Sequence, residues 1–207
     1  MTNEGEALPP ARRTLATGDL ARVAVFAALI AALGLPGTIT ALGNQVPITL
    51  QTFGVMLAGA ILGRWRGALA VIVLLVLVAA GLPLLAGGRG GLGVFAEVSA
   101  GYLIGWPVGA FVTGWIVERG GYKPGIVRLL VACAVGGIAV IYLFGIPVVA
   151  VRGELTLGQA AVGSLLFVPG DVIKVVLAAL VVRATQRAYP DAVPAVHRER
   201  LRAAGER

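Results

Sequence analysis

The chain has 207 residues, of which 58% are hydrophobic and only 13% are charged, and its formal net charge is +7. Its mean hydropathy of +0.92 excludes an ordinary soluble domain and predicts an integral membrane protein. The single cysteine, Cys133, and the single histidine, His197, leave no set of residues for a disulfide, a thiolate metal site or a membrane-embedded histidine site.

Six apolar segments follow one another along the chain, and each is expected to form a membrane helix. A helix needs about 20 apolar residues to cross a bilayer, and it satisfies its own backbone hydrogen bonds where water is absent. The second and third segments are shorter, so we expect them to be tilted, buried among neighbours or extended by polar flanks. The segments are residues 20–35, 50–62, 67–80, 100–117, 126–144 and 160–182.

The predicted fold class is therefore an all-α integral membrane protein with six transmembrane helices. Residues 20–184 form the membrane domain, between a polar N-terminal segment, residues 1–19, and a basic C-terminal tail, residues 185–207. Arg12 and Arg13 precede the first helix and invite a signal-peptide interpretation. We discount it, because the even helix count requires this segment and no convincing cleavage site follows it.

Positive charges fall almost entirely on one side of this six-helix layout. The opposite side receives only Arg89 and Arg152, and Lys174 lies inside the last segment. By the positive-inside rule both termini are cytoplasmic. Topology thus accounts for the net charge, and no nucleic-acid partner is predicted. The residues on the predicted cytoplasmic side are Arg12, Arg13, Arg22, Arg64, Arg66, Arg119, Lys123, Arg128, Arg183, Arg187, Arg198, Arg200, Arg202 and Arg207.

Three helices are followed by similar tripeptides, Gly-Leu-Pro or Gly-Ile-Pro, at residues 34–36, 81–83 and 145–147. Glycine suits a helix C-terminus and proline prevents continuation, so we expect the first, third and fifth helices to end there, on the outer side. Two long loops are expected on that side, the uncharged residues 37–49 and the glycine-rich residues 84–99. Such loops are often binding elements or lids, with simple solvated connections as the alternative.

Asp171 and Lys174 stand in the otherwise apolar run VPGDVIKVVLAAL, about halfway along the sixth segment. At positions i and i+3 they lie on one side of a helix. A charge at the centre of a membrane helix costs about 2.5 to 3.5 kcal/mol, so two charges need a compensating role. We expect them to bind a neutral, polar small molecule, with the Asp accepting and the Lys donating hydrogen bonds. The alternative is an intrahelical ion pair near a helix end, with Lys174 reaching toward the interface.

Further polar candidates gather toward the outer side. Thr49, Gln51 and Thr52 open the second segment, and Tyr102 opens the fourth. In the glycine-rich loop, Arg89 and the backbone N–H groups, including that of Gly91, are available to an anionic ligand group. Each has a structural alternative: Thr49 as a helix cap, Tyr102 as an interfacial aromatic, Arg89 as a solvated cation. Their common location favours one substrate-binding site.

Alanines form two neighbouring rows on the first helix. One row holds Ala24, Ala28 and Ala32, and the other holds Ala27 and Ala31. Rows of small residues let helix backbones approach closely. Periodicity alone does not decide whether a row packs inside the protein, which is the default, or against a partner.

The missing motifs also limit the function. The chain has no G-x-x-x-x-G-K-[ST] phosphate loop, so it is not expected to hydrolyse ATP by that route. It has no membrane histidine to activate a serine nucleophile. We therefore expect no enzymatic activity and no cofactor or metal on this chain.

Five motifs, in order along the chain, carry a family resemblance. They are VPITLQTFGVMLAG at 46–59, LGRWRGALAV at 62–71, GLPLLAGGRGGLGVF at 81–95, AGYLIGWPVGAF at 100–111 and FVPGDVIKVVLAAL at 167–180. Together they resemble BioY, the biotin-specific substrate-binding (S) component of energy-coupling factor (ECF) transporters. P-I-T-L-Q-T and P-G-D-x-x-K are specific as a pair, whereas the glycine-rich pieces are not.

The resemblance implies a compact six-helix S-component bundle in the cytoplasmic membrane of a bacterium or archaeon, with a biotin pocket toward the outer face. It implies that a scaffold membrane subunit and two ABC ATPases supply the energy from ATP, which agrees with the missing phosphate loop. It assigns ligand binding to Asp171 and Lys174, and contact with the scaffold subunit to one of the two alanine rows. Where family members read close to G-P-T-G-G-Y, residues 97–102 read EVSAGY, so Glu97 receives no role from the resemblance.

Biotin suits this inventory of side chains. Its ureido ring offers one acceptor oxygen and two N–H donors, which Lys174 and Asp171 would meet, and its carboxylate would meet Arg89 or loop N–H groups. Two alternatives remain open. One is a self-sufficient carrier driven by a proton or ion gradient, with Asp171 titrating; the other is a membrane enzyme acting on a lipid-like substrate.

Overall fold

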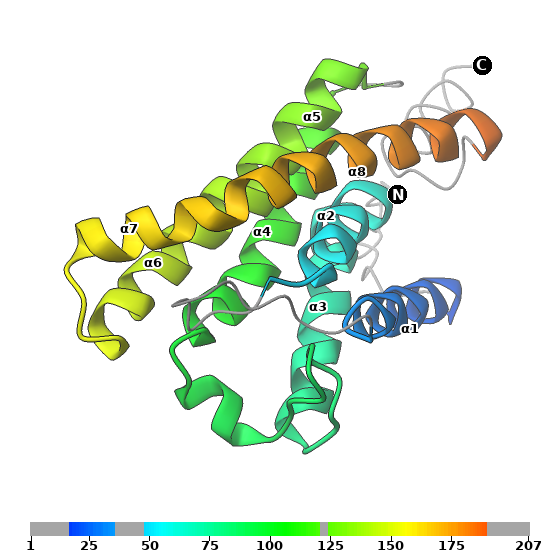
Figure 1. The fold of residues 1–207 in the computed structure, drawn as a ribbon. Coiled ribbons are helices and arrows are strands. Elements are labelled where there is room, and N and C mark those ends of the chain that lie inside the picture. Colours follow the sequence, from blue (N-terminus) through cyan, green and yellow to red (C-terminus); the bar gives the residue numbers. More distant parts are fainter. Residues whose placement is uncertain (1–16, 36–47, 121–123, 190–207) are drawn as a thin grey trace, which may run out of the picture.

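The computed structural model describes residues 17–35, 48–120 and 124–189, and these ranges form six helical rods (Figure 1). The first four are α1 (Thr17–Ala32), α2 (Gln51–Leu62), α3 (Arg64–Ala79) and α4 (Ala100–Glu118). The fifth rod joins α5 (Ile126–Ala134), the π-helical η2 (Val135–Val140) and α6 (Ile141–Arg152), and the sixth joins α7 (Leu157–Ser164), the 3₁₀ turn η3 (Leu165–Phe167) and α8 (Val168–Ala188). A short 3₁₀ helix, η1 (Leu92–Ala96), lies between α3 and α4. The prediction of six helices is confirmed.

Helix α4 lies at the centre of the bundle, in contact with α2, α3, η2 and α6. The α7–α8 rod crosses α2 and α5, and α1 packs on α2 and α3 (Figure 1). Small residues permit the close approach of α4 and η2: a Cβ atom added to Gly136 would lie 2.0 Å from Thr113 Oγ1. Close backbone contact of this kind is how membrane helices associate where no water drives burial.

Three rods, Ala100–Glu118, Ile126–Arg152 and Leu157–Ala188, are long and apolar enough to cross a membrane. The 12-residue α2 is shorter than a span, as the sequence indicated, and most of its side chains are buried. Of the three explanations offered for its length, burial among neighbouring helices is therefore the one that the structure supports.

The prediction that the fifth helix ends at residues 145–147 is wrong. The rod continues through Pro147 to Arg152. Proline removes one backbone hydrogen bond, which a long membrane helix tolerates when its neighbours hold it in place. Gly145 is needed for packing, because a Cβ atom there would lie 2.4 Å from the Tyr102 ring. The sixth rod is also longer than the predicted residues 160–182.

Contacts between helix ends define the two poles of the bundle. The Arg64 N–H donates to Glu118 Oε1 at 2.9 Å, and Arg66 pairs with Asp19 at 2.8 Å. The N-terminus of α1, the α2–α3 turn and the C-terminus of α4 therefore share one end, which we call the arginine-rich pole. The side of the membrane that it faces stays a prediction. The described arginines at this pole are Arg22, Arg64, Arg66, Arg119, Arg128, Arg183 and Arg187, whereas Arg89 and Arg152 lie at the opposite pole.

Helix α1 begins at Thr17 and α8 ends at Ala188, close to the predicted limits of the membrane domain. Residues 37–47 of the first outer loop, most of the basic tail, and Arg12, Arg13 and Lys123 lie outside the described residues.

Candidate functional site

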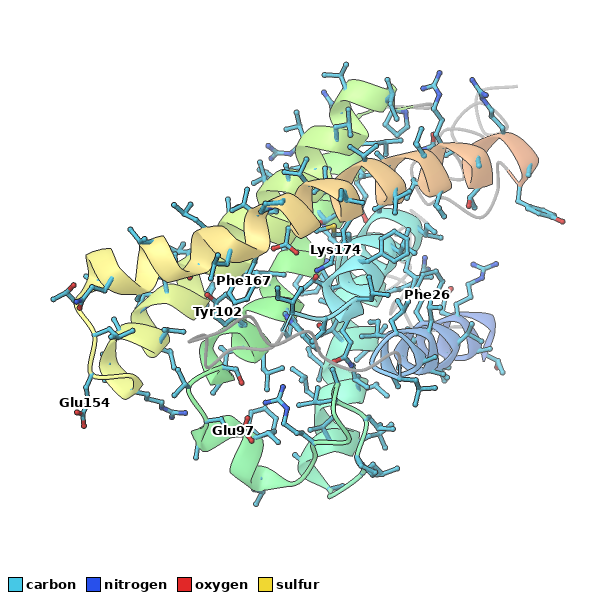
Figure 2. The ribbon with its side chains drawn as sticks, in the orientation of Figure 1. Phe26, Glu97, Tyr102, Glu154, Phe167 and Lys174 are labelled. Atoms are coloured by element: carbon cyan, nitrogen blue, oxygen red, sulfur yellow. The ribbon has the colours of Figure 1, made fainter. Side chains whose placement is uncertain are left out.

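A pocket opens between α2, α4, α6 and the α7–α8 rod, on the pole opposite the arginine-rich one. The space free of protein atoms in it, counting the open solvent at its mouth, is about 580 Å³. Lys174, Phe167 and Tyr102 lie between the α7–α8 rod and the helices beneath it (Figure 2). The lining residues are Ile48, Thr49, Gln51, Thr52, Leu85, Arg89, Ser99, Tyr102, Leu103, Trp106, Ile141, Tyr142, Phe167, Asp171 and Lys174.

The predicted charged pair forms one wall of this pocket. Lys174 Nζ lies 2.8 Å from Asp171 Oδ1, and the two residues are only 6% and 4% exposed. Lys174 Nζ also donates to Thr52 Oγ1 at 3.1 Å, and the Tyr142 hydroxyl donates to Asp171 Oδ2 at 2.7 Å. The pair is therefore held from α2 and α6 as well as from its own helix. It is not a peripheral ion pair with a lysine reaching toward the interface.

Counting partners among the described residues only, this network leaves hydrogen-bonding capacity of Asp171 and Lys174 unused. An ammonium group has three N–H donors, and Lys174 uses two of them on Asp171 and Thr52. Each carboxylate oxygen of Asp171 accepts one bond and has a second lone pair available. The wall can therefore donate one hydrogen bond to a ligand and accept others from it.

Aromatic rings enclose the rest of the pocket. The Tyr102 ring meets the rings of Tyr142 and Phe167 edge to face, with centroids 5.9 Å and 6.1 Å apart. Its hydroxyl lies 2.8 Å from Ser164 Oγ, which donates its own proton to the Ala160 carbonyl, so Tyr102 is the donor. The indole N–H of Trp106 is buried and has no acceptor among the described residues.

Gln51 lines the pocket, but its amide is largely committed to the backbone. Its Nε2 donates to the carbonyls of Ile30 and Leu84 at 3.2 Å and 3.0 Å, and its Oε1 accepts from the Ala86 N–H at 3.0 Å. The Ile30 carbonyl is in the last turn of α1, where no helical N–H remains to bond it. Gln51 therefore ties the end of α1 to the loop after α3, and the structure favours a positioning role over direct ligand contact.

Thr49 also lies on the pocket wall, where its Oγ1 accepts from the Gln51 N–H at 3.3 Å. This bond resembles a helix cap, the structural alternative considered for Thr49, and it leaves the Thr49 hydroxyl proton available to a ligand.

Arg89 lies at the mouth of the pocket and is not simply solvated. It pairs with Glu97, donates to Ser99 Oγ at 3.3 Å, and donates from Nε to the Ala86 carbonyl at 3.2 Å. Arg152 adds two 2.8 Å bonds to the backbone carbonyls of Phe95 and Glu97. Glu97, which the sequence left without a role, thus orients Arg89.

The prediction that the backbone N–H of Gly91 binds the ligand is wrong. Gly91 does not line the pocket, and its N–H donates to the Val78 carbonyl at 2.7 Å. Its φ of 82° explains the glycine, because this conformation favours a residue without a Cβ atom. Its role is to turn the chain after α3.

The two alanine rows of α1 point in different directions. Ala27 is buried in the bundle and Ala31 is partly buried, whereas Ala24, Ala28 and Ala32 are exposed. The row of Ala27 and Ala31 packs internally, and the row of Ala24, Ala28 and Ala32 is available on the surface.

No role was expected for Tyr142, Trp106 or Phe167. Each is an aromatic residue in an apolar helix, where a core role is the usual explanation. The phenol of Tyr142, near the end of the fifth predicted segment, was the one signal, since a buried hydroxyl requires a partner.

The chain is similar to known proteins over most of its length. It is 50% identical over 181 residues to the "Biotin transporter BioY" of Rhizobium etli, covering 85% of this chain and 97% of that protein. It is 48% identical over 180 residues to the protein of the same name from Rhodobacter capsulatus, covering 83% and 94% of the two chains.

Among solved structures, the fold matches the "S-component for biotin from an ECF-type ABC transporter" with a TM-score of 0.78 at 30% identity, over 82% of this chain and 91% of that one. The family model described as "BioY family" matches residues 6–191. The chain therefore belongs to the BioY family.

Proposed function

We propose that this protein captures biotin for uptake across the membrane, as the substrate-binding subunit of an ECF-type importer. The observation that carries the proposal is the buried Asp171–Lys174 pair, with unused hydrogen-bonding capacity, on the wall of an aromatic pocket in a BioY chain. The relatives named biotin transporters and the matching S-component for biotin support it.

The pocket chemistry matches the parts of biotin. Asp171 accepts from ureido N–H groups, and the free N–H of Lys174 donates to the ureido oxygen. The rings of Tyr102 and Phe167 enclose the apolar bicycle, and Arg89 at the mouth receives the carboxylate. Thr49 and the unpartnered Trp106 N–H are further donors for ligand oxygens.

The partners proposed are a scaffold membrane subunit and two ABC ATPases, with ATP used by those partners. The exposed row Ala24, Ala28 and Ala32 is the proposed scaffold contact, because its small side chains let another helix approach closely and the neighbouring Ala27 is already buried. The protein resides in the cytoplasmic membrane of a bacterium or archaeon, with both termini in the cytoplasm. It is a transport subunit, not an enzyme.

The test is retention of biotin by the purified protein, measured by mass spectrometry after denaturation. Wild type is expected to release about one biotin per chain, and Asp171→Asn and Lys174→Met are expected to release none while remaining monodisperse. Unchanged retention in both variants would exclude this site. A separate uptake assay in liposomes addresses the ion-coupled carrier: biotin accumulation by the protein alone, driven by a proton gradient, would contradict the subunit role.

A further inference from the structure

A second groove opens at the arginine-rich pole, between the end of α4 and the start of α5. It is lined by Trp115, Ile116, Arg119, Gly125, Val127, Arg128 and Val131. Two guanidinium groups therefore share one groove with apolar side chains. It is separate from the ligand pocket, with which it shares no lining residue.

The two arginines differ from others at the same pole. Arg22 and Arg66 pair with Asp19, and Arg64 pairs with Glu118. Within the described ranges, neither Arg119 nor Arg128 has a carboxylate partner. Among the residues that the structure describes, two positive charges without a carboxylate partner are thus presented together.

The surroundings position both cations. The Arg119 guanidinium lies 3.8 Å from the centroid of the Trp115 ring, which is a cation–π contact. The Arg128 side chain runs past Gly120, where an added Cβ atom would lie 2.6 Å from its Cδ. The C-terminal end of α4 and the turn after it thus contact both side chains, through the Trp115 ring for Arg119 and Gly120 for Arg128.

Beside the cations the groove is apolar. Val127 and Val131 are 70% and 49% exposed, and they lie one turn apart on the outer surface of α5. Both α4 and the α5–α6 rod are long and apolar enough to span a membrane, so this surface continues into the hydrocarbon region. Cationic side chains above an apolar track match an anionic headgroup above an acyl chain.

We propose that this groove binds an anionic phospholipid, with Arg119 and Arg128 on the phosphate and the upper acyl chain along Val127 and Val131. A free phosphate would leave the valine track unused. The site is independent of biotin binding.

The test is native mass spectrometry of the full chain titrated with phosphatidylglycerol or phosphatidylcholine of the same acyl chains. Wild type is expected to prefer phosphatidylglycerol. Arg119→Gln/Arg128→Gln is expected to lose roughly 30-fold in affinity for it, from about a fivefold contribution of each cation near the surface. The matched control Arg183→Gln/Arg187→Gln removes the same charge from α8, outside the groove, and is expected to change binding less than about twofold.

Equal binding of both lipids by wild type, or equal losses in the two double variants, would overturn the proposal. So would a groove variant that keeps its lipid preference but fails to assemble with scaffold and ATPase subunits, because the groove would then be a protein contact. If the double variant is not monodisperse, Val127→Trp provides the test: it fills the track, keeps both charges, and is expected to weaken phosphatidylglycerol binding.

Discussion

The Tyr142 hydroxyl on α6 donates a 2.7 Å hydrogen bond to Asp171 Oδ2 on α8. The bond joins the fifth and sixth rods at the pocket and directs the carboxylate that we assign to the ureido ring. Hydrogen bonds to a charged group contribute about 1.5 to 3 kcal/mol. Tyr142→Phe is therefore expected to weaken biotin binding by roughly tenfold or more, measured by calorimetry. Tyr189→Phe, at the exposed end of α8, is the matched control and is expected to bind normally.

Because Asp171 and Lys174 form a buried pair, replacing one of them is expected to destabilise the protein more than replacing both. Removing one partner leaves an uncompensated buried charge, at a cost of about 3 to 5 kcal/mol, whereas an apolar pair of similar size is often tolerated. Asp171→Leu and Lys174→Met are each expected to lower the melting temperature, and Asp171→Leu/Lys174→Met to recover most of it. All three variants are expected to lose biotin binding. A double variant less stable than either single variant would contradict the account of the pair.

Gly145 predicts a packing defect in the pocket. In Gly145→Ala the new methyl group would stand 2.4 Å from the Tyr102 ring, so the ring must shift from the position in which it contacts Ser164 and Phe167. We expect lower biotin affinity together with a lower melting temperature. Gly163→Ala is the control: no atom lies within 4 Å of its added Cβ, so the better helix propensity of alanine should leave stability equal or higher.

Replacing Gln51 is expected to disturb the loop after α3 first, and biotin binding only as a consequence. Gln51→Leu deprives the Leu84 carbonyl and the Ala86 N–H of their partner, at about 1 to 3 kcal/mol for each buried group left unpaired. Backbone amides of residues 84–89 are expected to exchange hydrogen faster, with a weaker biotin affinity as the consequence. Loss of affinity with unchanged exchange would instead make Gln51 a direct ligand contact.

The predicted orientation can be tested with introduced cysteines, because the native Cys133 is buried. Leu155→Cys lies in the α6–α7 connection, near Arg152 and away from the arginine-rich pole, and Arg187→Cys lies near the end of α8. A membrane-impermeant maleimide should label the first variant in intact cells and the second only after permeabilisation. The reverse pattern would invert the topology.

The class of the fold and the number of helices could be read from the sequence, which also singled out Asp171 and Lys174 as candidate ligand-binding residues. These followed from segment length, hydropathy and the cost of charge in hydrocarbon, all of which are local properties of the chain. The prediction that the fifth helix ends at Pro147 was wrong. Whether a proline ends a helix depends on the helices packed around it, and the local sequence does not specify those neighbours.

The packing of the helices determines which residues share the candidate site. It placed Tyr142 and Thr52 on the charged pair, gave Glu97 to Arg89, committed Gln51 to backbone groups, and moved Gly91 outside the pocket. It also separated the buried and exposed alanine rows of α1. The physical reason is the same throughout: hydrogen-bond partners and burial depend on how the rods pack, and residues far apart in the chain meet only there.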